Sequence, residues 1–451
     1  MINSAIDRYH ALVDQANLTP ADFQGFTARM REARVMYGDR VQVEYMRAQF
    51  LSPEQNALIK HAAQTIWSAM DKLSEHFFSD PRFIEELGLT PHERELAAID
   101  PGYPGFSTMA RFDSFLIGDH LQFVELNAEC PAGPAYTEIM AEVFLQDPVM
   151  QAFGKEYAIQ GFKTRDRLIK TLLETYEIWA KGKGLGAKPG RIAIVDWDGL
   201  STRHEFEMCK AFFESKGIPT VIEDPRRLRF EEGKLLASDG SVIDLVYRRV
   251  LTHEFIGKWD EVQALVEAYR AGSVCVVNSF RSKFLHKKMI FGLLTDGANQ
   301  HLFSPEEREA IARHIPWTRK VRPGKTDYHG TEIDLIDYIR ANRDRMVMKP
   351  NDDYGGRGIY IGWESTNEEW EEAINKAMEH AYVVQEKVRV ASALFPTVRE
   401  ELVYDQLNVD LDPFVWKGEV EGFLTRLSGT ALCNVTSGGG IVPTFVIEPR
   451  A

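Results

Sequence analysis

The spacing of hydrophobic residues changes along the chain, and these changes divide it into segments of different structure. Residues 1–95 read mainly as helices, because apolar residues recur there at helical spacing. In residues 52–78, Ser52 stands at an expected N-cap and Pro53 in the first turn. The apolar stripe that follows is Leu58, Ala62, Ile66 and Met70. This stripe predicts a helix that packs one face on the core.

Two strands are expected next, in "ARFDSFLIGDHLQFVELN", residues 110–127, around a turn at Gly118–Asp119. Helices follow up to "GKGLGAKPG", residues 182–190. Gly and Pro are concentrated there, which favours a domain boundary. We therefore expect residues 96–184 to hold a hairpin and its connecting helices.

Strands and helices alternate from residue 185 to 280, which predicts a mostly parallel sheet with helical crossovers, a Rossmann-like α/β domain. The turn after its first strand, "DWDGLST", is not GxGxxG, so dinucleotide binding is disfavoured. Residues 281–451 read as α+β. They contain an expected helix in "HKKMIFGLLTD", a strand, Gly-rich loop and strand in "RMVMKPNDDYGGRGIYIG", a short strand in "YVVQEKV" and a hairpin in "FVWKGEVEGFLTRLSG".

Composition narrows the classes of function. The chain has 451 residues and a hydrophobic content of 44%, which suits a globular protein with a sizeable core. A formal net charge of -14 argues against nucleic-acid partners and anionic membrane surfaces. No segment resembles a signal peptide or a membrane span. The four cysteines are scattered, so we expect reduced thiols in a cytoplasmic protein.

The expected hairpin carries the first candidate chemistry. Glu125 and Asn127 share one face of a strand. If Gly118–His120 form a three-residue loop, Asp113 lies opposite Glu125 and Arg111 opposite Asn127, whereas a two-residue turn would send Asp113 to the other face. Three oxygen ligands on one face are typical of a Mg²⁺ site. The alternative is an ordinary polar surface hairpin.

A second candidate lies in "VMKPNDDYGGRG". Lys349 ends a predicted strand, and Gly355 and Gly356 follow in a loop that can bring backbone N–H groups close to phosphate. The alternative is a surface hairpin that needs glycine in its turn. Arg426, just before a second Gly-rich segment, suits a phosphoryl group or a carboxylate, or is an exposed strand cation. No nucleophile motif is present.

Taken in order, these motifs resemble the glutathionylspermidine synthetases, a circularly permuted branch of the ATP-grasp ligases. The matching positions are Arg111-x-Asp113, Glu125-x-Asn127, Lys288 (or its neighbour Lys287), Lys349, Gln385 and Arg426. The metal motif precedes the lysines, and this inverted order marks the permuted branch. The resemblance covers roughly residues 100–451, and the amidase domain of some members is not expected here.

The resemblance implies an ATP-grasp fold and an ATP-dependent carboxylate–amine ligase that forms an acyl phosphate and releases ADP. It implies Mg²⁺ at Asp113, Glu125 and Asn127, ATP phosphates at the two lysines and adenine near Gln385. It gives Arg111 and Arg426 the role of stabilising charge in the transfer. The partners would be a small acid and an amine. Two alternatives stay open: a nucleotide-binding regulatory protein without turnover, and a phosphotransferase that stops at a phosphorylated product. The sequence does not indicate the oligomeric state.

The α/β domain adds basic residues that could help to hold an anionic substrate, namely Arg203, Arg248 and Arg249. Surface exposure or salt bridges explain them equally simply.

Overall fold

A computed structural model describes residues 1–353, 356–430 and 439–450 of the chain. Its centre is an antiparallel sheet with the strand order β23-β22-β21-β4-β5, and β20 pairs with β21 beside this path. The strands are β4 (Met109–Ile117), β5 (His120–Asn127), β20 (Ala391–Val398), β21 (Leu402–Trp416), β22 (Glu419–Ser428) and β23 (Gly440–Val442). The predicted hairpins at residues 110–127 and 414–429 are confirmed. Together they form one sheet, because β4 pairs with the far end of β21.

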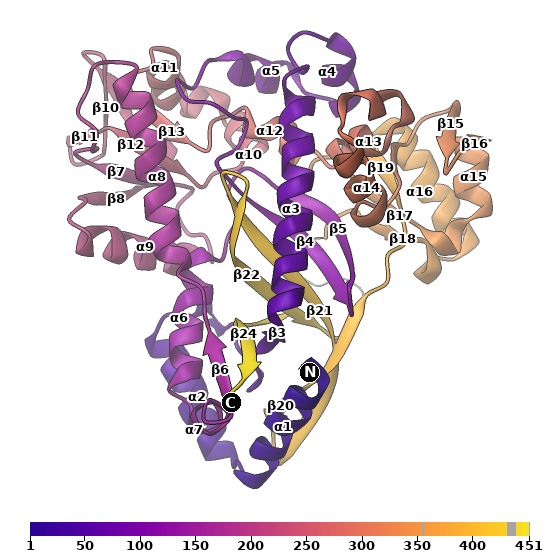
Figure 1. Cartoon of the computed structure of the whole chain (residues 1–451). Coiled ribbons are helices and arrows are strands. Elements are labelled where there is room, and N and C mark those ends of the chain that lie inside the picture. Colours follow the sequence, from indigo (N-terminus) through magenta and orange to yellow (C-terminus); the bar gives the residue numbers. More distant parts are fainter. Residues whose placement is uncertain (354–355, 431–438, 451) are drawn as a thin grey trace.

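The long helix α3 (Pro53–Ser74) crosses this sheet (Figure 1). Ser52 caps it as predicted, and Gln55 completes a capping box. Its buried face packs against Phe112 and Leu126, whose side chains point away from the polar face of the hairpin. Leu58, expected in the apolar stripe, is only partly buried, and Ile59 takes the core position.

The chain ends meet below the central sheet, where both termini are marked in Figure 1. Strand β3 (Gln49–Leu51) lies parallel to β24 (Thr444–Pro449), which also pairs with β6 (Tyr157–Gln160). The predicted helical character of residues 1–95 is confirmed, but this segment packs against the last strand rather than standing alone. The elements around this junction are α1 (Ile2–Gln15), α2 (Pro20–Glu32), β1 (Met36–Tyr37), β2 (Arg40–Val41), α6 (Pro134–Leu145), α7 (Pro148–Phe153) and α8 (Thr164–Lys181).

The predicted parallel sheet is confirmed between residues 192 and 277. Its strand order is β13-β12-β7-β8, and all its pairs are parallel. The strands are β7 (Ile192–Val195), β8 (Thr220–Glu223), β12 (Leu245–Arg248) and β13 (Cys275–Val277), with helices α9 (Arg203–Ser215), α10 (Thr252–Ile256) and α11 (Gln263–Arg270). A small antiparallel sheet joins β9 (Arg229–Glu231), β10 (Lys234–Leu236) and β11 (Val242–Ile243).

Asn278, after β13, ties this domain to the hairpin. Its buried amide nitrogen donates to the carbonyls of Met109 at 2.8 Å and Ala128 at 3.0 Å, and its oxygen accepts from the N–H of Thr108 at 2.8 Å. The hairpin is therefore held at a defined position relative to the parallel sheet.

A third sheet, of order β14-β19-β17-β18, lies on the other side of the hairpin (Figure 1). It contains β14 (Thr318–Lys320), β17 (Met346–Pro350), β18 (Tyr360–Ile361) and β19 (Tyr382–Glu386), beside the pair β15 (Lys325–Tyr328) and β16 (Thr331–Asp334). The remaining helices are α4 (Pro81–Leu87), α5 (Pro91–Ala98), α12 (Ser282–His286), α13 (Met289–Thr295), α14 (Pro305–His314), α15 (Leu335–Ala341) and α16 (Asn367–Glu379).

The helix expected in "HKKMIFGLLTD" is confirmed at Met289–Thr295, but it does not include the two lysines. The chain leaves the helical conformation at Lys287, with φ -62° and ψ 129°, and α13 starts after Lys288. Asn351 supports the break, because its carbonyl accepts from the N–H of Lys288 at 2.9 Å and its side chain accepts from the N–H of Met289 at 2.9 Å. In the described part of the chain, no helix is both long and apolar enough to span a bilayer.

Candidate active site

The β4–β5 hairpin brings the predicted metal-site residues onto one face. Asp113 lies opposite Glu125, and Arg111 lies opposite Asn127, as the sequence predicts. Arg111 and Asp113 are buried, and Asn127 is partly buried. These side chains therefore face the interior of the molecule, so the alternative of an ordinary surface hairpin is wrong.

The turn expected at Gly118–Asp119 is confirmed, but the three-residue loop on which the pairing of Asp113 with Glu125 was made to depend is not formed. Ile117 pairs with His120, so the turn has two residues and not three. The register is restored by a β-bulge, since Ser114 pairs with Phe123 and leaves Val124 as the extra residue of β5. A bulge inserts one residue and returns the following side chains to the other face. Asp113 and Glu125 therefore lie opposite each other because of the bulge and not because of the length of the turn.

Asp113 is the centre of the hydrogen bonds on this face. Arg111 Nε donates to its Oδ1 at 3.1 Å, and Asn127 Nδ2 donates to the same oxygen at 2.9 Å and to Glu125 Oε1 at 3.3 Å. Burial raises the pKa of Asp113, although Arg111 and Arg426 oppose this effect. The two arginines therefore do not fully offset the cost of burying the Asp113 carboxylate, and a further cation beside it would stabilise its ionised form.

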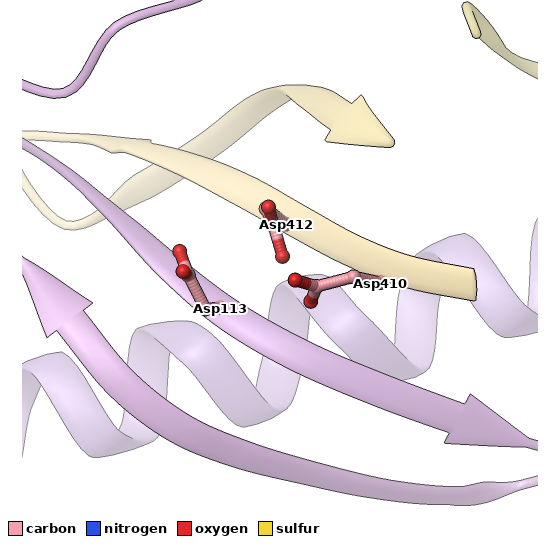
Figure 2. A group of neighbouring side chains, drawn as sticks. All are labelled: Asp113, Asp410 and Asp412. Atoms are coloured by element: carbon pink, nitrogen blue, oxygen red, sulfur yellow. The ribbon is translucent and has the colours of Figure 1, made fainter. Parts of the chain in front are cut away.

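Two further acids come from β21, and neither belongs to the motifs expected from the sequence. Figure 2 shows Asp410 and Asp412 beside Asp113, and one carboxylate oxygen of each of the three lies within 4.8 Å of the other two. Arg426 on β22 connects them: its Nη2 bonds to Asp113 and Asp410, and its Nε lies 3.0 Å from Asp412 Oδ2. The alternation of acids in "NVDLDP", residues 408–413, places them on one strand face and could have revealed them.

Arg426 is thus not an exposed strand cation, and it contacts three acids. Its side chain is 12% exposed. Burial raises the pKa of Asp412 well above its ordinary value, even though Arg426 acts to lower it. Two guanidinium groups, those of Arg111 and Arg426, thus face three buried carboxylates.

The geometry distinguishes the two neighbouring lysines. Lys288 Nζ lies 3.4 Å from Glu125 Oε2 and donates to the carbonyl of Asp353 at 2.7 Å. Lys287 points elsewhere, with its Nζ 3.0 Å from Glu93 and 2.7 Å from Asp352. Lys288 is therefore the lysine that faces the hairpin acids.

Lys349 reaches the same acids from β17. Its Nζ donates to Gln385 Oε1 at 2.8 Å and lies 3.4 Å from the carbonyl of Val124. Burial lowers its pKa to about 8, Glu125 opposes this effect, and Lys288 adds to it. Burial would raise the pKa of Glu125, but Lys288, Lys349 and Arg426 hold it well below its ordinary value. An anionic ligand beside this amine would stabilise its protonated form.

Gln385 has both ends of its amide engaged. Its oxygen accepts from Lys349, and its nitrogen donates to Thr318 Oγ1 at 3.1 Å. It is buried in β19 and orients the lysine. Gly356 lies in the loop after β17 with φ 77°, while Gly355 lies outside the described residues.

Two cavities meet at these residues. The smaller, about 140 Å³, lies between the hairpin and the third sheet and is lined by Lys349, Gly356 and Gln385. The larger, about 290 Å³, lies between the hairpin and the parallel sheet. Glu125 and Arg426 line both cavities, so these two side chains stand at their common wall.

The residues present fit a hard divalent cation. Carboxylate and amide oxygens are the ligands that Mg²⁺ prefers in proteins. Asp410 Oδ1 and Asp412 Oδ2 are buried and accept no hydrogen bond from any described residue. Asn127 presents its NH₂ group to the acids in this arrangement, so coordination through its oxygen requires the amide to turn over.

A second buried charge network supports the wall of the larger cavity. Glu129, directly after β5, is 3.2 Å from Arg248 Nη1 and 3.3 Å from Lys283 Nζ. Lys283 and Lys287 also contact Asp352 in the loop after β17. The network links the hairpin, the parallel sheet and the third sheet, and the salt-bridge interpretation of Arg248 is confirmed.

Comparison with known proteins agrees with this architecture. Residues 228–428, somewhat under half of the chain, match the family model described as circularly permuted ATP-grasp type 2. A glutathione synthetase-like effector from Globodera pallida superposes with a TM-score of 0.57 at 12% identity, over 95% of this chain and 99% of that one. The fold is thus the mixed α/β fold of the circularly permuted ATP-grasp proteins, as the motif order predicts.

The relatives found by sequence similarity are distant. A Frankia alni protein provisionally named glutamate–cysteine ligase 2-3 is 22% identical over 72% of this chain and 36% of its own length. An uncharacterized protein of Mycobacterium tuberculosis strain H37Rv is 22% identical over 68% of this chain and 58% of its own. The chain therefore spans between about a third and three fifths of the curated relatives it matches.

Proposed function

We propose that the chain is an ATP-dependent carboxylate–amine ligase that works through an acyl phosphate and releases ADP and phosphate. The observation that carries this proposal is that Glu125 and Arg426 form a wall common to both cavities. Phosphoryl transfer between two bound molecules requires their reacting ends to meet at one place. The fold of the circularly permuted ATP-grasp proteins supports the same class of reaction.

ATP would occupy the smaller cavity. Lys288 and Lys349 would neutralise the phosphates, and the backbone at Gly356 would approach them closely. The adenine would lie beside β19, against the apolar walls that Val388 and Val390 provide. In this proposal Gln385 acts by holding Lys349 rather than by contacting the base.

Asp113, Glu125 and Asn127 would hold Mg²⁺, and Asp410 and Asp412 extend this oxygen donor set beyond the motif. A metal held there would supply positive charge that offsets negative charge in the transfer. The buried acids of the chain provide that site, and they also hold the guanidinium of Arg426.

The acid and the amine would bind in the larger cavity. A carboxylate oxygen of the acid bonds to the γ-phosphorus as the bond between that phosphorus and the ADP oxygen breaks. Arg111 and Arg426 stabilise charge on the carboxylate and on the transferred group. The amine nitrogen then bonds to the acyl carbon, loses a proton, and inorganic phosphate leaves. The walls exclude water, which would otherwise hydrolyse the acyl phosphate.

The first substrates to test are peptide-like and γ-glutamyl acids. This choice follows the resemblance to glutathionylspermidine synthetases and the provisional name of the Frankia alni relative. The chain with MgATP is screened for ADP release with each acid, with and without an amine, and products are identified by mass.

The result separates the three candidate functions. A ligase forms an amide only when acid and amine are both present. A phosphotransferase accumulates a phosphorylated acid and needs no amine. A regulatory protein melts at a higher temperature with MgATP but turns nothing over.

Variants test the site itself. Asp113→Asn and Glu125→Gln are expected to lower turnover by about 100-fold or more, the usual scale for losing one preorganised electrostatic group. Glu419→Gln, at an exposed position on β22, serves as the matched control and keeps turnover. Near-normal turnover in either site variant would contradict the metal assignment.

A further inference from the structure

His286 is a buried histidine at the wall of the larger cavity, outside the matched motif positions. It ends α12, a helix that packs against β5 of the hairpin. Its side chain is 5% exposed, and it lines the cavity together with Glu125 and Arg426, the two side chains of the common wall. Lys288, two residues further along the chain, lies 3.4 Å from Glu125 Oε2. His286 therefore faces the cavity in which the amine would meet the acyl phosphate.

The imidazole ring of His286 has unused hydrogen-bonding capacity. Its Nδ1 is buried and has no hydrogen-bond partner among the described residues. Its Nε2 lies 3.8 Å from Glu129 Oε2, which is too far for a hydrogen bond but close enough for the carboxylate to favour a proton on the ring. Glu129 is itself held in place by Arg248 and Lys283. The ring thus lacks a polar partner that a ligand in the cavity can supply.

Burial decides the charge of this ring. It lowers the pKa of His286 to about 4; Glu129 and Asp352 oppose this effect, and Lys283 and Lys288 add to it. The ring is therefore uncharged at pH 7, and one of its nitrogens keeps a lone pair. Phosphate bound at Lys288 would offset the effect of that lysine and raise the pKa of the ring.

Other side chains of the cavity lining can also accept a proton. Glu125 already serves the lysines and the proposed metal. Burial raises the pKa of the Cys130 thiol to about 12, so this thiol stays protonated at pH 7. Asp196 and Glu254 come from the parallel-sheet domain, where Asp196 directly follows β7 and burial raises its pKa to about 7. Asp196 is thus the main rival to His286, which is uncharged and follows the chain directly to Lys288.

We infer that His286 binds the amine substrate by accepting a hydrogen bond from its N–H and takes a proton from that nitrogen as the amide forms. The inference rests on the proposed ligase function and deepens it by naming the group that activates the amine. The amine nitrogen bonds to the acyl carbon, the bond between that carbon and the phosphate oxygen breaks, and the N–H proton passes to the ring. Glu129 stabilises the charged ring until the proton leaves to water.

The experiment compares amines that differ in basicity. The full chain with MgATP is given glutamate or γ-glutamylcysteine as the acid, and glycine, 1,3-diaminopropane or hydroxylamine as the amine. Amide or hydroxamate is measured. Hydroxylamine is weakly basic and loses its proton to water readily after it attacks, so hydroxamate reports the acyl phosphate without requiring a base. The variants are His286→Gln, His286→Ala and the rival Asp196→Asn.

His286→Gln is expected to lower amide formation from glycine or 1,3-diaminopropane by about 100-fold, the scale of general-base catalysis, and hydroxamate formation by less than about threefold. Imidazole added to His286→Ala should restore part of the lost amide formation. The matched control is His314→Gln, which keeps both activities. His314 is a buried histidine outside both cavity linings, and its Nδ1 lies 2.9 Å from the carbonyl of Leu121.

Two results of this comparison would overturn the inference. A purely structural role of His286 would lower amide and hydroxamate formation equally in His286→Gln. A base at Asp196 would show the selective loss of amide formation in Asp196→Asn and not in His286→Gln.

A second measurement does not depend on turnover. The wild-type chain with isotope-labelled histidine is followed by NMR, and the variants at His286 assign its ring nitrogens. With MgATP present, the lone-pair nitrogen of His286 is expected to shift on addition of glycine or 1,3-diaminopropane and not of acetate. If this shift occurs while no substrate pair releases ADP, the ligase proposal fails and amine binding at His286 stands. If neither amine shifts the resonance, the inference is overturned.

Discussion

Replacing Asp196 by Asn is expected to stabilise the fold, and to do so more strongly as the pH rises. The pKa of Asp196 is raised from 3.8 to about 7 in the folded chain. The unfolded chain therefore releases this proton first, and raising the pH favours unfolding until the folded chain also ionises near pH 7. The stability associated with the protonated carboxyl is complete below about pH 4 and is lost as the pH rises through about 7.

The magnitude follows from the two pKa values. One unit of pKa corresponds to about 1.4 kcal/mol, so ionisation of Asp196 costs up to about 4 kcal/mol at pH 8 and about 1.5–2 kcal/mol at pH 5. Asn does not ionise. The advantage of Asp196→Asn over the wild-type chain should thus grow by about 2–3 kcal/mol between pH 5 and pH 8. Any change in packing adds an offset that does not depend on pH.

The assay is urea unfolding followed by tryptophan fluorescence at pH 5, 6, 7 and 8, and the quantity compared is the difference between variant and wild type at each pH. Asp224→Asn provides a control of opposite sign. Burial acts to raise the pKa of Asp224, but hydrogen bonds from Arg226 and from the N–H of Asp198 lower it to about 2. This shift corresponds to about 2.5 kcal/mol before solvent screening is taken into account, so the loss of Asp224 should destabilise the chain at pH 7 by about 1–2 kcal/mol and matter less toward pH 2. A difference between Asp196→Asn and wild type that stays constant from pH 5 to pH 8 would refute the reasoning.

The remaining predictions concern the buried charges around the two cavities. Lys349→Ala should weaken MgATP binding in calorimetry by about tenfold or more, because a charged contact to phosphate is lost. Lys325→Ala, at an exposed position, is the control. Unchanged MgATP affinity in Lys349→Ala would exclude the phosphate role. Lys288→Ala should likewise weaken MgATP binding, whereas Lys287→Ala should lower stability in urea and leave nucleotide affinity nearly intact; the reverse pattern would exchange their roles. Glu129→Gln should destabilise the chain in urea by about 3–5 kcal/mol, because Arg248 and Lys283 lose a buried partner; a loss below about 1 kcal/mol would show that the network is not tightly coupled.

The comparison of Lys287 with Lys288 shows where local pattern stops being informative. Both lysines fit one helical period, and the sequence leaves the choice open. The helix breaks between them because Asn351, far along the chain, hydrogen-bonds the backbone at Lys288 and Met289. Packing decides a contact between residues so far apart in the sequence. The spacing of hydrophobic residues around the two lysines therefore does not reveal it.

The hairpin shows a partial success of the same kind. The sequence places Asp113 opposite Glu125 only if the loop has three residues. The pairing is correct, but the turn has two residues, and a bulge at Val124 sets the register instead. Bulges respond to the neighbouring strand, here β21, whose Asp412 accepts from the N–H of Ser114 at 3.3 Å.

By itself, the sequence determined the local structure of this protein. It predicts the helices of the first segment, the alternation of strands and helices in the parallel sheet, the hairpins, and the strand face that Glu125 and Asn127 share. These follow from backbone geometry, which repeats every 2 or 3.6 residues regardless of the rest of the chain. Only the tertiary structure placed Asp410, Asp412 and Arg426 against Asp113 and put Asp196 at the edge of a cavity shared with the hairpin. Those contacts depend on which sheet faces pack together. The burial that this packing creates shifts the pKa values of the charged groups in the site.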